Sequence, residues 1–259
     1  MNCTYCWDFD QRERMGELAT DEIKKILLSA KLLGVRSFNP FGGEPFLRKD
    51  AVEIIQYAFE LGFKRVTVTT NGTLLAEEKI KELVQSVPPG AELCVLVSLD
   101  GSHPAENDFI RSPGSFLKTI RTIEHFDLYR KQLGKFVSLV MNTVVSRNNF
   151  RSMVDQVALN KRLGGDCVHF ITPIANGGLV GDGMADRQLF ILPEDFDELD
   201  RQIDRIIHVA KTTDGVLNNP SSLQNFKEFY RRQYRQHEQI IISAQIAKKN
   251  EVPVRLQMP

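Results

Sequence analysis

The stretch Met1-Asn2-Cys3-Thr4-Tyr5-Cys6-Trp7, taken together with Phe41-Gly42-Gly43-Glu44-Pro45, decides how the rest of the chain is interpreted. Cys3 and Cys6 form a C-x-x-C pair, which fits half of a zinc site, a redox pair or two unrelated thiols. A Gly-Gly turn is most often a tight turn that needs a positive φ. Each feature is weak by itself, and it becomes informative only through its order in the chain and through the motifs farther along the sequence.

The composition is that of a globular domain with a large core. The chain has 259 residues, of which 42% are hydrophobic and 25% are charged, and this is compatible with one α/β domain. Lys+Arg and Asp+Glu both number 33, so the balance of charge favours neither a nucleic-acid partner nor an anionic membrane surface. The apolar runs are of strand length and no secretory signal is visible, so we expect no membrane association and a cytoplasmic location.

From residue 20 onward, helical and strand patterns alternate. Thr20 is a good N-cap, and the apolar residues after it fall on one helix face that ends at Gly34. The strand patterns are nearly continuous apolar runs, so the alternation predicts a parallel sheet with helices outside it. The predicted strands are residues 35–41, 65–70, 92–99, 135–145 and 166–171, and the predicted helices are residues 20–33, 50–61, 77–84, 115–126, 150–163, a helix that begins at Pro193, and residues 223–249.

Ligands of a parallel βα sheet bind at the carboxyl ends of the strands, where loops and helix N-termini converge. The candidate site residues are therefore those at or just after the predicted strand ends. An ordinary structural role competes with function at each of them: a turn for the glycines, Asn71 and Asp100, a satisfied buried amide for Asn142, and a solvated surface charge for Arg111. The candidates at these strand ends are Gly42, Gly43, Glu44, Pro45, Asn71, Ser98, Asp100 and Asn142. Arg111 lies farther downstream, and it becomes a candidate only through the resemblance described next.

In this order, the cysteine pair, the Gly-Gly-Glu-Pro turn and the strand-end motifs resemble the radical S-adenosylmethionine (radical SAM) superfamily. Its signature is C-x-x-x-C-x-x-C on a loop, followed by G-G-E-P at the end of the next strand. Cys3 and Cys6 match the last two cysteines, whereas the first would stand four residues before Cys3, outside this sequence. The resemblance implies an α/β fold of the partial (β/α)6 barrel type whose first strand is missing from this chain. It also implies a [4Fe–4S] cluster with Cys3 and Cys6 among its thiolate ligands, and S-adenosyl-L-methionine (SAM) as cofactor.

The resemblance also implies a role for each candidate. The turn at Glu44 would offer backbone groups and a carboxylate to the SAM ammonium, a charge-assisted contact. Arg111 would pair with the SAM carboxylate, for which a guanidinium is a good bidentate match. The remaining implied contacts are Tyr5 over the adenine, Asn71 along the cofactor cleft, Ser98 and Asp100 toward the ribose, and Asn142 in the same cleft.

The implied reaction is reductive cleavage of SAM at the cluster, followed by abstraction of a hydrogen atom from a substrate. The Ser98-Leu99-Asp100-Gly101 element with Arg111 resembles the branch that contains sulfatase-maturing and peptide-modifying enzymes. That branch implies a peptide or protein substrate, an electron donor such as flavodoxin or ferredoxin, and a cysteine-rich domain with auxiliary clusters beyond Pro259. We expect residues 1–173 to form the radical SAM core and residues 174–259 a helical extension.

Three other interpretations stay open. The substrate is a tetrapyrrole or another small molecule in some members of the same branch. A degenerate relative without the full cluster motif would bind SAM or a partner without catalysis, and with two of the three cysteines the chain as given is expected to be inactive. A plain βα-barrel hydrolase or aldolase would need a lysine or a carboxylate pair at the strand ends, and none stands out.

Cys94 and Cys167 lie in apolar strands, so we expect both to be buried, inert thiols.

Overall fold

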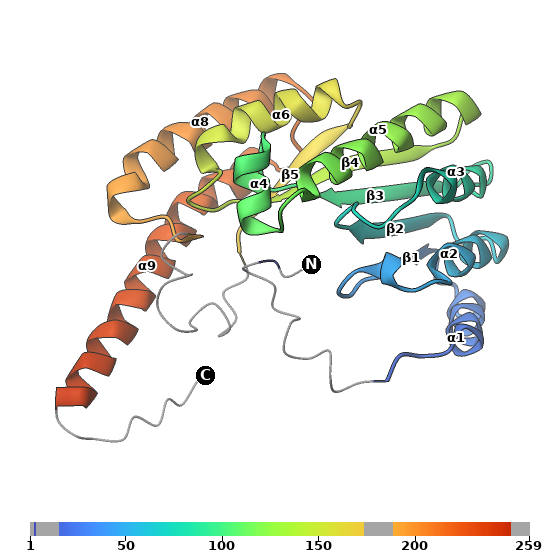
Figure 1. Ribbon diagram of the computed structural model, residues 1–259, viewed down its shortest axis with the longest axis horizontal. Coiled ribbons are helices and arrows are strands. Elements are labelled where there is room, and N and C mark those ends of the chain that lie inside the picture. Colours follow the sequence, from blue (N-terminus) through green and yellow to red (C-terminus); the bar gives the residue numbers. More distant parts are fainter. Residues whose placement is uncertain (1–2, 4–15, 174–188, 250–259) are drawn as a thin grey trace.

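The structure is a computed structural model, which describes residue 3, residues 16–173 and residues 189–249, with side chains of the last helix described as far as residue 235. Within these ranges the chain alternates between strands and helices, as the sequence predicts (Figure 1). The elements in chain order are α1 (Thr20–Leu32), β1 (Ser37–Phe38), η1 (Pro45–Leu47), α2 (Ala51–Glu60), β2 (Arg65–Thr70), α3 (Glu77–Gln85), β3 (Glu92–Ser98), α4 (Pro104–Ile110), α5 (Ser115–Leu133), β4 (Val137–Val144), η2 (Phe150–Ser152), α6 (Met153–Arg162), β5 (Cys167–Ile171), η3 (Pro193–Asp195), α8 (Phe196–Thr212) and α9 (Pro220–Lys249).

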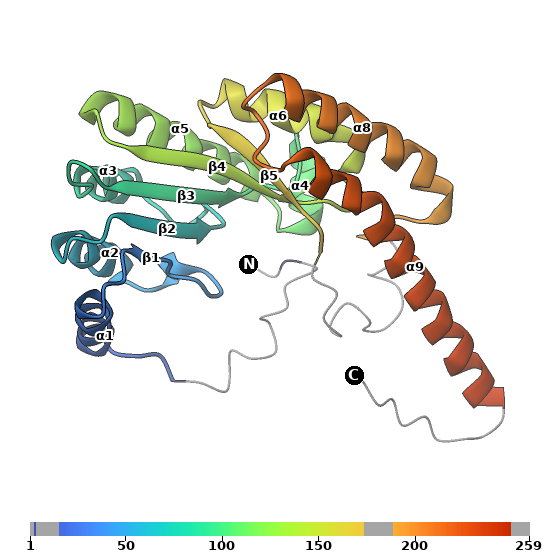
Figure 2. The ribbon, with the colours of Figure 1, turned by 180° about the vertical axis from the view of Figure 1, so that it is seen from behind.

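The five strands form one parallel sheet in the order β1-β2-β3-β4-β5. Each strand therefore lies beside its neighbour in the sequence, and a helical connection returns the chain to the start of the next strand, as parallel pairing requires. Figures 1 and 2 show α1, α2, α3, α5 and α6 following the outer side of this sheet. The arrangement is the wall of a partial βα barrel, which confirms the predicted α/β class.

Side chains along the strands alternate between a covered face and an open face. In β2 and β5, every second side chain is buried under the helices, while the side chains between them are partly or fully exposed. Successive strand residues point to opposite faces, so the exposed set lies on the concave side of the wall. The covered set includes Val66, Val68, Val168 and Phe170, and the concave set includes Arg65, Thr67, Cys167 and His169.

Two hydrophobic clusters fill the space between sheet and helices. The first packs β2, β3 and β4 against α2, α3 and α5 and contains Phe63 and Phe126. The second packs β4 and β5 against α6, α8 and α9 and contains Phe170 and Tyr230. Burial of each such side chain contributes about 1.5–3 kcal/mol, so these clusters hold the strands, and with them the strand ends, in fixed positions.

The structure corrects three element predictions. The strand predicted over residues 35–41 is limited to Ser37–Phe38, and Pro40 beyond it has no N–H to donate to a strand ladder. Helix α4 was not predicted, although Pro104 stands at its first turn, where proline is favoured. Helix α5 runs on to Leu133, seven residues past the predicted end at residue 126, and stops at Gly134 in the left-handed region.

The outer edge of β5 is covered by the segment that connects α8 to α9. Val216 forms a parallel bridge with Val168. Asn218 binds the backbone of Phe170 twice: its Nδ2 donates to the carbonyl and its Oδ1 accepts from the N–H, both at 2.8 Å. This segment satisfies backbone groups that an open strand edge would expose.

No helix within the described ranges has the length and apolar character that crossing a membrane requires.

Candidate functional site

The Gly-Gly-Glu-Pro turn is fixed to the end of β2 by the carboxylate of Glu44. Its Oε1 accepts hydrogen bonds from Thr70 Oγ1 at 2.8 Å and from the Phe46 N–H at 3.2 Å. Its Oε2 accepts from the Asn71 N–H at 2.7 Å. Burial raises the pKa of Glu44, and the hydrogen bonds from Asn71, Thr70 and Phe46 oppose that rise. Oε2 keeps a further lone pair, so the carboxylate holds the turn in place and can still accept from a ligand.

A second turn, at Asn71 and Gly72, is tied to helix α5. Asn71 Oδ1 accepts from the N–H and the hydroxyl of Thr73, at 2.8 and 2.6 Å. The carbonyls of Asn71 and Gly72 accept from Thr119 and Thr122 on α5, at 2.8 and 2.6 Å. Gly72 has a φ of +70°, and a Cβ at this position would lie 3.2 Å from a Val97 methyl. The turn therefore needs glycine both for its backbone conformation and for its close packing.

Asp100 and Arg111 form a buried ion pair at the ends of β3 and α4. Arg111 Nε lies 2.6 Å from Asp100 Oδ2, and the two residues are 8% and 0% exposed. Asp100 Oδ1 accepts from the Val144 N–H at 2.8 Å. The Asp100 carboxylate is thus enclosed by protein groups and binds β4 and Arg111 to the end of β3. The positive charge of Arg111 acts to lower the pKa of Glu44. The Gly-Gly-Glu-Pro turn and the Asp100–Arg111 ion pair are therefore neighbours.

Three polar side chains stand in register across the concave face, at the end of β3 and two residues before the ends of β4 and β5. Ser98 on β3 pairs with Asn142 on β4, and Asn142 pairs with His169 on β5. All three are half-buried. Asn142 Oδ1 lies 3.0 Å from His169 Nδ1. We call these three residues the polar row; it continues the line of polar groups that begins at Glu44 and Asn71.

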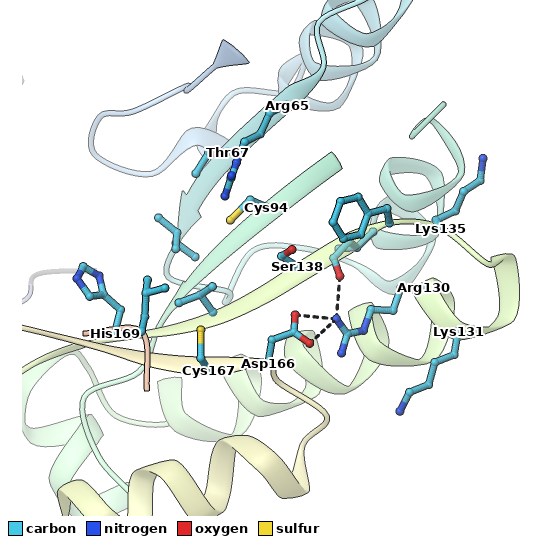
Figure 3. Close-up of a pocket in the computed structure, with 15 residues that line it drawn as sticks. Arg65, Thr67, Cys94, Arg130, Lys131, Lys135, Ser138, Asp166, Cys167 and His169 are labelled. Carbon is cyan, nitrogen blue, oxygen red and sulfur yellow. Dashed lines mark hydrogen bonds and ion pairs between the residues drawn. The ribbon is translucent and has the colours of Figure 1, made fainter. Parts of the chain in front are cut away.

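Below the polar row, the concave face forms a cavity of about 790 Å³ (Figure 3). Leu96 and Val140 give its floor an apolar character, while Cys94 and Cys167 both point into it. Cys94 is buried, as predicted, whereas Cys167 is half-buried and faces the cavity. Burial raises the pKa of the Cys167 thiol to about 11. A thiol with this pKa stays protonated at neutral pH, so it is a weak nucleophile, which agrees with the inert character expected of it.

At the amino-terminal end of the strands, Arg130 closes one side of this cavity. Figure 3 shows its guanidinium directed at Asp166, with Nη1–carboxylate distances of 2.9 and 3.0 Å. Arg130 also donates to the carbonyls of Val137 at 2.7 Å and Gly164 at 2.6 Å. Its donors are used to hold α5, β4 and β5 together, so Arg130 reads as a structural residue.

The structure brings most of the predicted site residues to one edge of the sheet. Glu44, Asn71, Asp100 and Arg111 are joined by the contacts above, and Gly42, Gly43 and Pro45 belong to the same turn. Cys3 is half-exposed, whereas Tyr5 and Cys6 lie outside the described residues. Among the residues that are described, no three His, Cys, Asp or Glu side chains gather as metal ligands do. The predicted contacts to SAM stay predictions for every one of these residues.

Sequence reasoning assigned no role to His169, and it did not predict the contact that Thr70 makes with Glu44. Thr70 fixes Glu44, and its hydroxyl also accepts from the Gly72 N–H at 3.0 Å. His169 completes the polar row. The signal for His169 was present, because it precedes the predicted end of its strand by two residues, as Asn142 nearly does in its own strand. Strand alternation then places both on one face.

Comparison with known proteins connects this geometry to a family. The model of the Radical SAM superfamily matches residues 1–156, which is more than half of the chain. AdoMet-dependent heme synthase from Methanosarcina barkeri is 33% identical over 181 residues, covering 68% of this chain and 49% of that protein. The mycofactocin maturase MftC of Mycolicibacterium smegmatis is 29% identical over 164 residues, covering 62% of this chain and 39% of that protein.

Solved structures show the same fold. Streptococcus suis SuiB bound to S-adenosylmethionine superposes with a TM-score of 0.61 at 18% identity, covering 83% of this chain and 46% of SuiB. A structure of anSMEcpe with bound AdoMet gives a TM-score of 0.60 at 21% identity, covering 83% of this chain and 58% of that one. The chain spans about half the length of the curated relatives it matches. On the sequence match and the shared architecture together, this chain is a member of the radical SAM superfamily.

Proposed function

We propose that this protein binds SAM along the carboxyl edge of its sheet and uses it to abstract a hydrogen atom from a substrate. Enzymes of the family use a [4Fe–4S] cluster and SAM. The observation that carries the proposal is the continuous line of polar groups from Glu44 to His169, which lies where a parallel sheet binds its ligands. A cluster bound here would supply the electron that cleaves SAM and so generates the radical.

The chain's own part in this chemistry is to bind, orient and exclude water. Glu44 accepts from the SAM ammonium through the remaining lone pair of Oε2, while Thr70 and Asn71 keep the carboxylate in position. Asp100 holds Arg111 next to Glu44, so that a cationic and an anionic group face the two charged ends of an amino acid. The apolar floor of the concave face keeps water away from a reactive species.

The fit of the cluster to this sequence is partial. Cys3 and Cys6 have the spacing of the last two ligands in the family signature, and thiolates are the ligands that such clusters take. We propose that the third thiolate comes from a residue that precedes Met1 in the natural protein. Anaerobic purification of a version lengthened with the residues encoded upstream tests this: we expect brown protein that contains iron and acid-labile sulfide. Bound zinc without sulfide would contradict it.

The substrate that we propose is a peptide or protein, with flavodoxin or ferredoxin as electron donor. MftC is named as a maturase, another relative at 29% identity is named PqqA peptide cyclase, and SuiB has been solved with the precursor peptide SuiA. These matches favour a peptide. The heme synthase match favours a tetrapyrrole or another small molecule, which is the second candidate.

Peptides encoded beside the gene separate the two candidates. The lengthened protein would be incubated without oxygen with reductant, SAM and each peptide in turn, and deoxyadenosine would be measured. A peptide substrate predicts faster deoxyadenosine formation and a mass change in one of the peptides. Equal rates with and without every peptide, and an acceleration by a porphyrin, would favour the small-molecule candidate.

A further inference from the structure

The polar row carries three hydrogen-bonding groups that the described part of the chain leaves unused. The Ser98 hydroxyl, the Asn142 side-chain amide nitrogen and His169 Nε2 make no hydrogen bond to any residue in the described ranges. Each belongs to a half-buried residue on the concave face. A set of three open donors and acceptors in register on a concave face is a candidate position for a polar ligand.

The contact between Asn142 and His169 determines what each group offers. The Asn142 Oδ1 that lies 3.0 Å from His169 Nδ1 is a carbonyl oxygen and can only accept, so Nδ1 carries the proton. Burial lowers the pKa of His169 from its ordinary value of 6.5, which keeps the ring neutral at pH 7. His169 Nε2 is then a bare acceptor, and the Asn142 Nδ2 beside it is a donor.

A donor and an acceptor on neighbouring strands match a pair of adjacent hydroxyl groups. Parallel strands lie about 4.8 Å apart, so side chains from β4 and β5 can reach two neighbouring oxygens of one sugar. One hydroxyl accepts from Asn142 Nδ2 and the other donates to His169 Nε2. We propose that His169 is a cofactor-binding residue, whose Nε2 accepts a hydrogen bond from the ribose diol of SAM while Asn142 fixes its ring and binds the other hydroxyl.

This inference rests on the proposed function, because it takes SAM as the ligand of the site. It agrees with the rest of the edge: with the amino-acid end of SAM at Glu44 beside β1, the nucleoside lies toward β4 and β5, where His169 stands. The cationic side chains of the cavity wall stand lower, at the amino-terminal ends of the strands, and Arg130 there is engaged by Asp166 and by two backbone carbonyls. The polar row is therefore the better match for an uncharged diol.

Two substitutions at His169 separate its two nitrogens. In His169→Asn, the shorter amide reaches the position of Nδ1, so the contact to Asn142 can persist while the Nε2 acceptor is lost. In His169→Gln, the longer amide places an oxygen near the position of Nε2. His125→Asn is the matched control, since this histidine lies on α5, next to Glu77 and away from the polar row.

The experiment measures the dissociation constants of SAM and of its 2′-deoxy and 3′-deoxy analogues by equilibrium dialysis against the lengthened, cluster-loaded protein. We expect His169→Asn to weaken SAM binding about threefold to tenfold, the effect of one neutral hydrogen bond, and His169→Gln to recover part of it. One deoxy analogue should bind the unmodified protein more weakly than SAM does, yet bind His169→Asn as tightly as SAM does. His125→Asn should match the unmodified protein.

The possible failures are distinguishable. If the unmodified protein binds SAM and His169→Asn binds it equally well, with the same melting temperature, the role of His169 is wrong and the proposed function stands. If His169→Asn loses the same factor for SAM and for both analogues, the residue does not contact the diol and the inference is again overturned. If the unmodified, cluster-loaded protein does not bind SAM, both the inference and the proposed function are overturned.

Discussion

At Glu44, burial and hydrogen bonding act on the carboxyl in opposite directions, and burial is the larger effect, so the pKa rises above its ordinary value of 4.5. A carboxyl with a raised pKa in the folded state gives a stability contribution that is complete below pH 4.5 and is lost as the pH rises through the raised value. The unmodified protein should therefore lose stability relative to Glu44→Gln across that window. Urea unfolding at a series of pH values checks this, and parallel pH profiles would contradict it.

The same substitution bears on SAM binding. Glu44→Gln keeps the shape of the side chain but removes the charge that faces the SAM ammonium. Loss of a charge-assisted hydrogen bond costs about 1.5–3 kcal/mol, which raises the dissociation constant of SAM roughly 10-fold to 100-fold. Equilibrium binding of SAM to the cluster-loaded protein measures this effect. Unchanged affinity with an intact cluster would remove Glu44 from the cofactor site.

The ion pair between Asp100 and Arg111 is a structural support inside the site. Because both partners are buried, Asp100→Ala removes the carboxylate that lies 2.6 Å from the Arg111 guanidinium, and we expect a loss of about 3–5 kcal/mol of unfolding free energy. As a control, Glu82→Gln breaks the exposed pair with Lys79 and should cost less than about 1 kcal/mol. Chemical denaturation of both variants gives the comparison. Equal losses would show that the buried pair is no more important than a surface one.

At the scale of single elements, the turn after β2 positions Asn71 against Glu44, and Gly72 makes that turn possible. Gly72→Ala places a Cβ 3.2 Å from Val97 and 3.3 Å from a Thr119 methyl, whereas Gly90→Ala, at a similar φ of +74°, meets no atom within 4 Å. Both substitutions carry the left-handed penalty of about 1–2 kcal/mol. We expect Gly72→Ala to cost roughly 1 kcal/mol more, from overpacking. Melting curves that shift equally would contradict the close approach of this turn to β3 and α5.

The sequence predicts which helices and strands exist more accurately than it predicts the residues at which they begin and end. The strands with several consecutive Val, Leu or Ile residues lie where the pattern predicts them, because burial on a parallel sheet requires such runs. The strand over residues 35–41 is predicted too long, since its pairing depends on the backbone beyond Pro40 and not on hydropathy. Helix α4 is missed because its seven residues are too few to show helical periodicity.

For the candidate site, the sequence likewise predicts which residues lie together but not the contacts that their side chains make. Motif order places Glu44, Asn71, Asp100 and Arg111 at one edge, because parallel strands bring their carboxyl ends together. Motif order does not reveal that Asp100 turns inward to Arg111 and Val144, or that Thr70 holds Glu44. These contacts depend on side-chain directions across three strands, which no local pattern encodes. His169 was overlooked because its partner, Asn142, lies on another strand.

At the scale of the whole molecule, one parallel wall carries the polar edge above and, below it, a cavity with an apolar floor. A ligand bound along the edge would therefore lie above the apolar floor that Leu96 and Val140 give to the cavity. The central claim is that this edge binds SAM for reductive cleavage. It depends on the polar line from Glu44 to His169, on Cys3 and Cys6, and on a third thiolate from outside this sequence.

The most direct test is a single incubation of the lengthened, cluster-loaded protein with SAM and dithionite in the absence of oxygen. The account predicts that methionine and 5′-deoxyadenosine form in equal amounts, and that a variant with Cys3→Ala and Cys6→Ala forms neither. SAM recovered intact from a protein whose iron and sulfide contents show a complete cluster would contradict it.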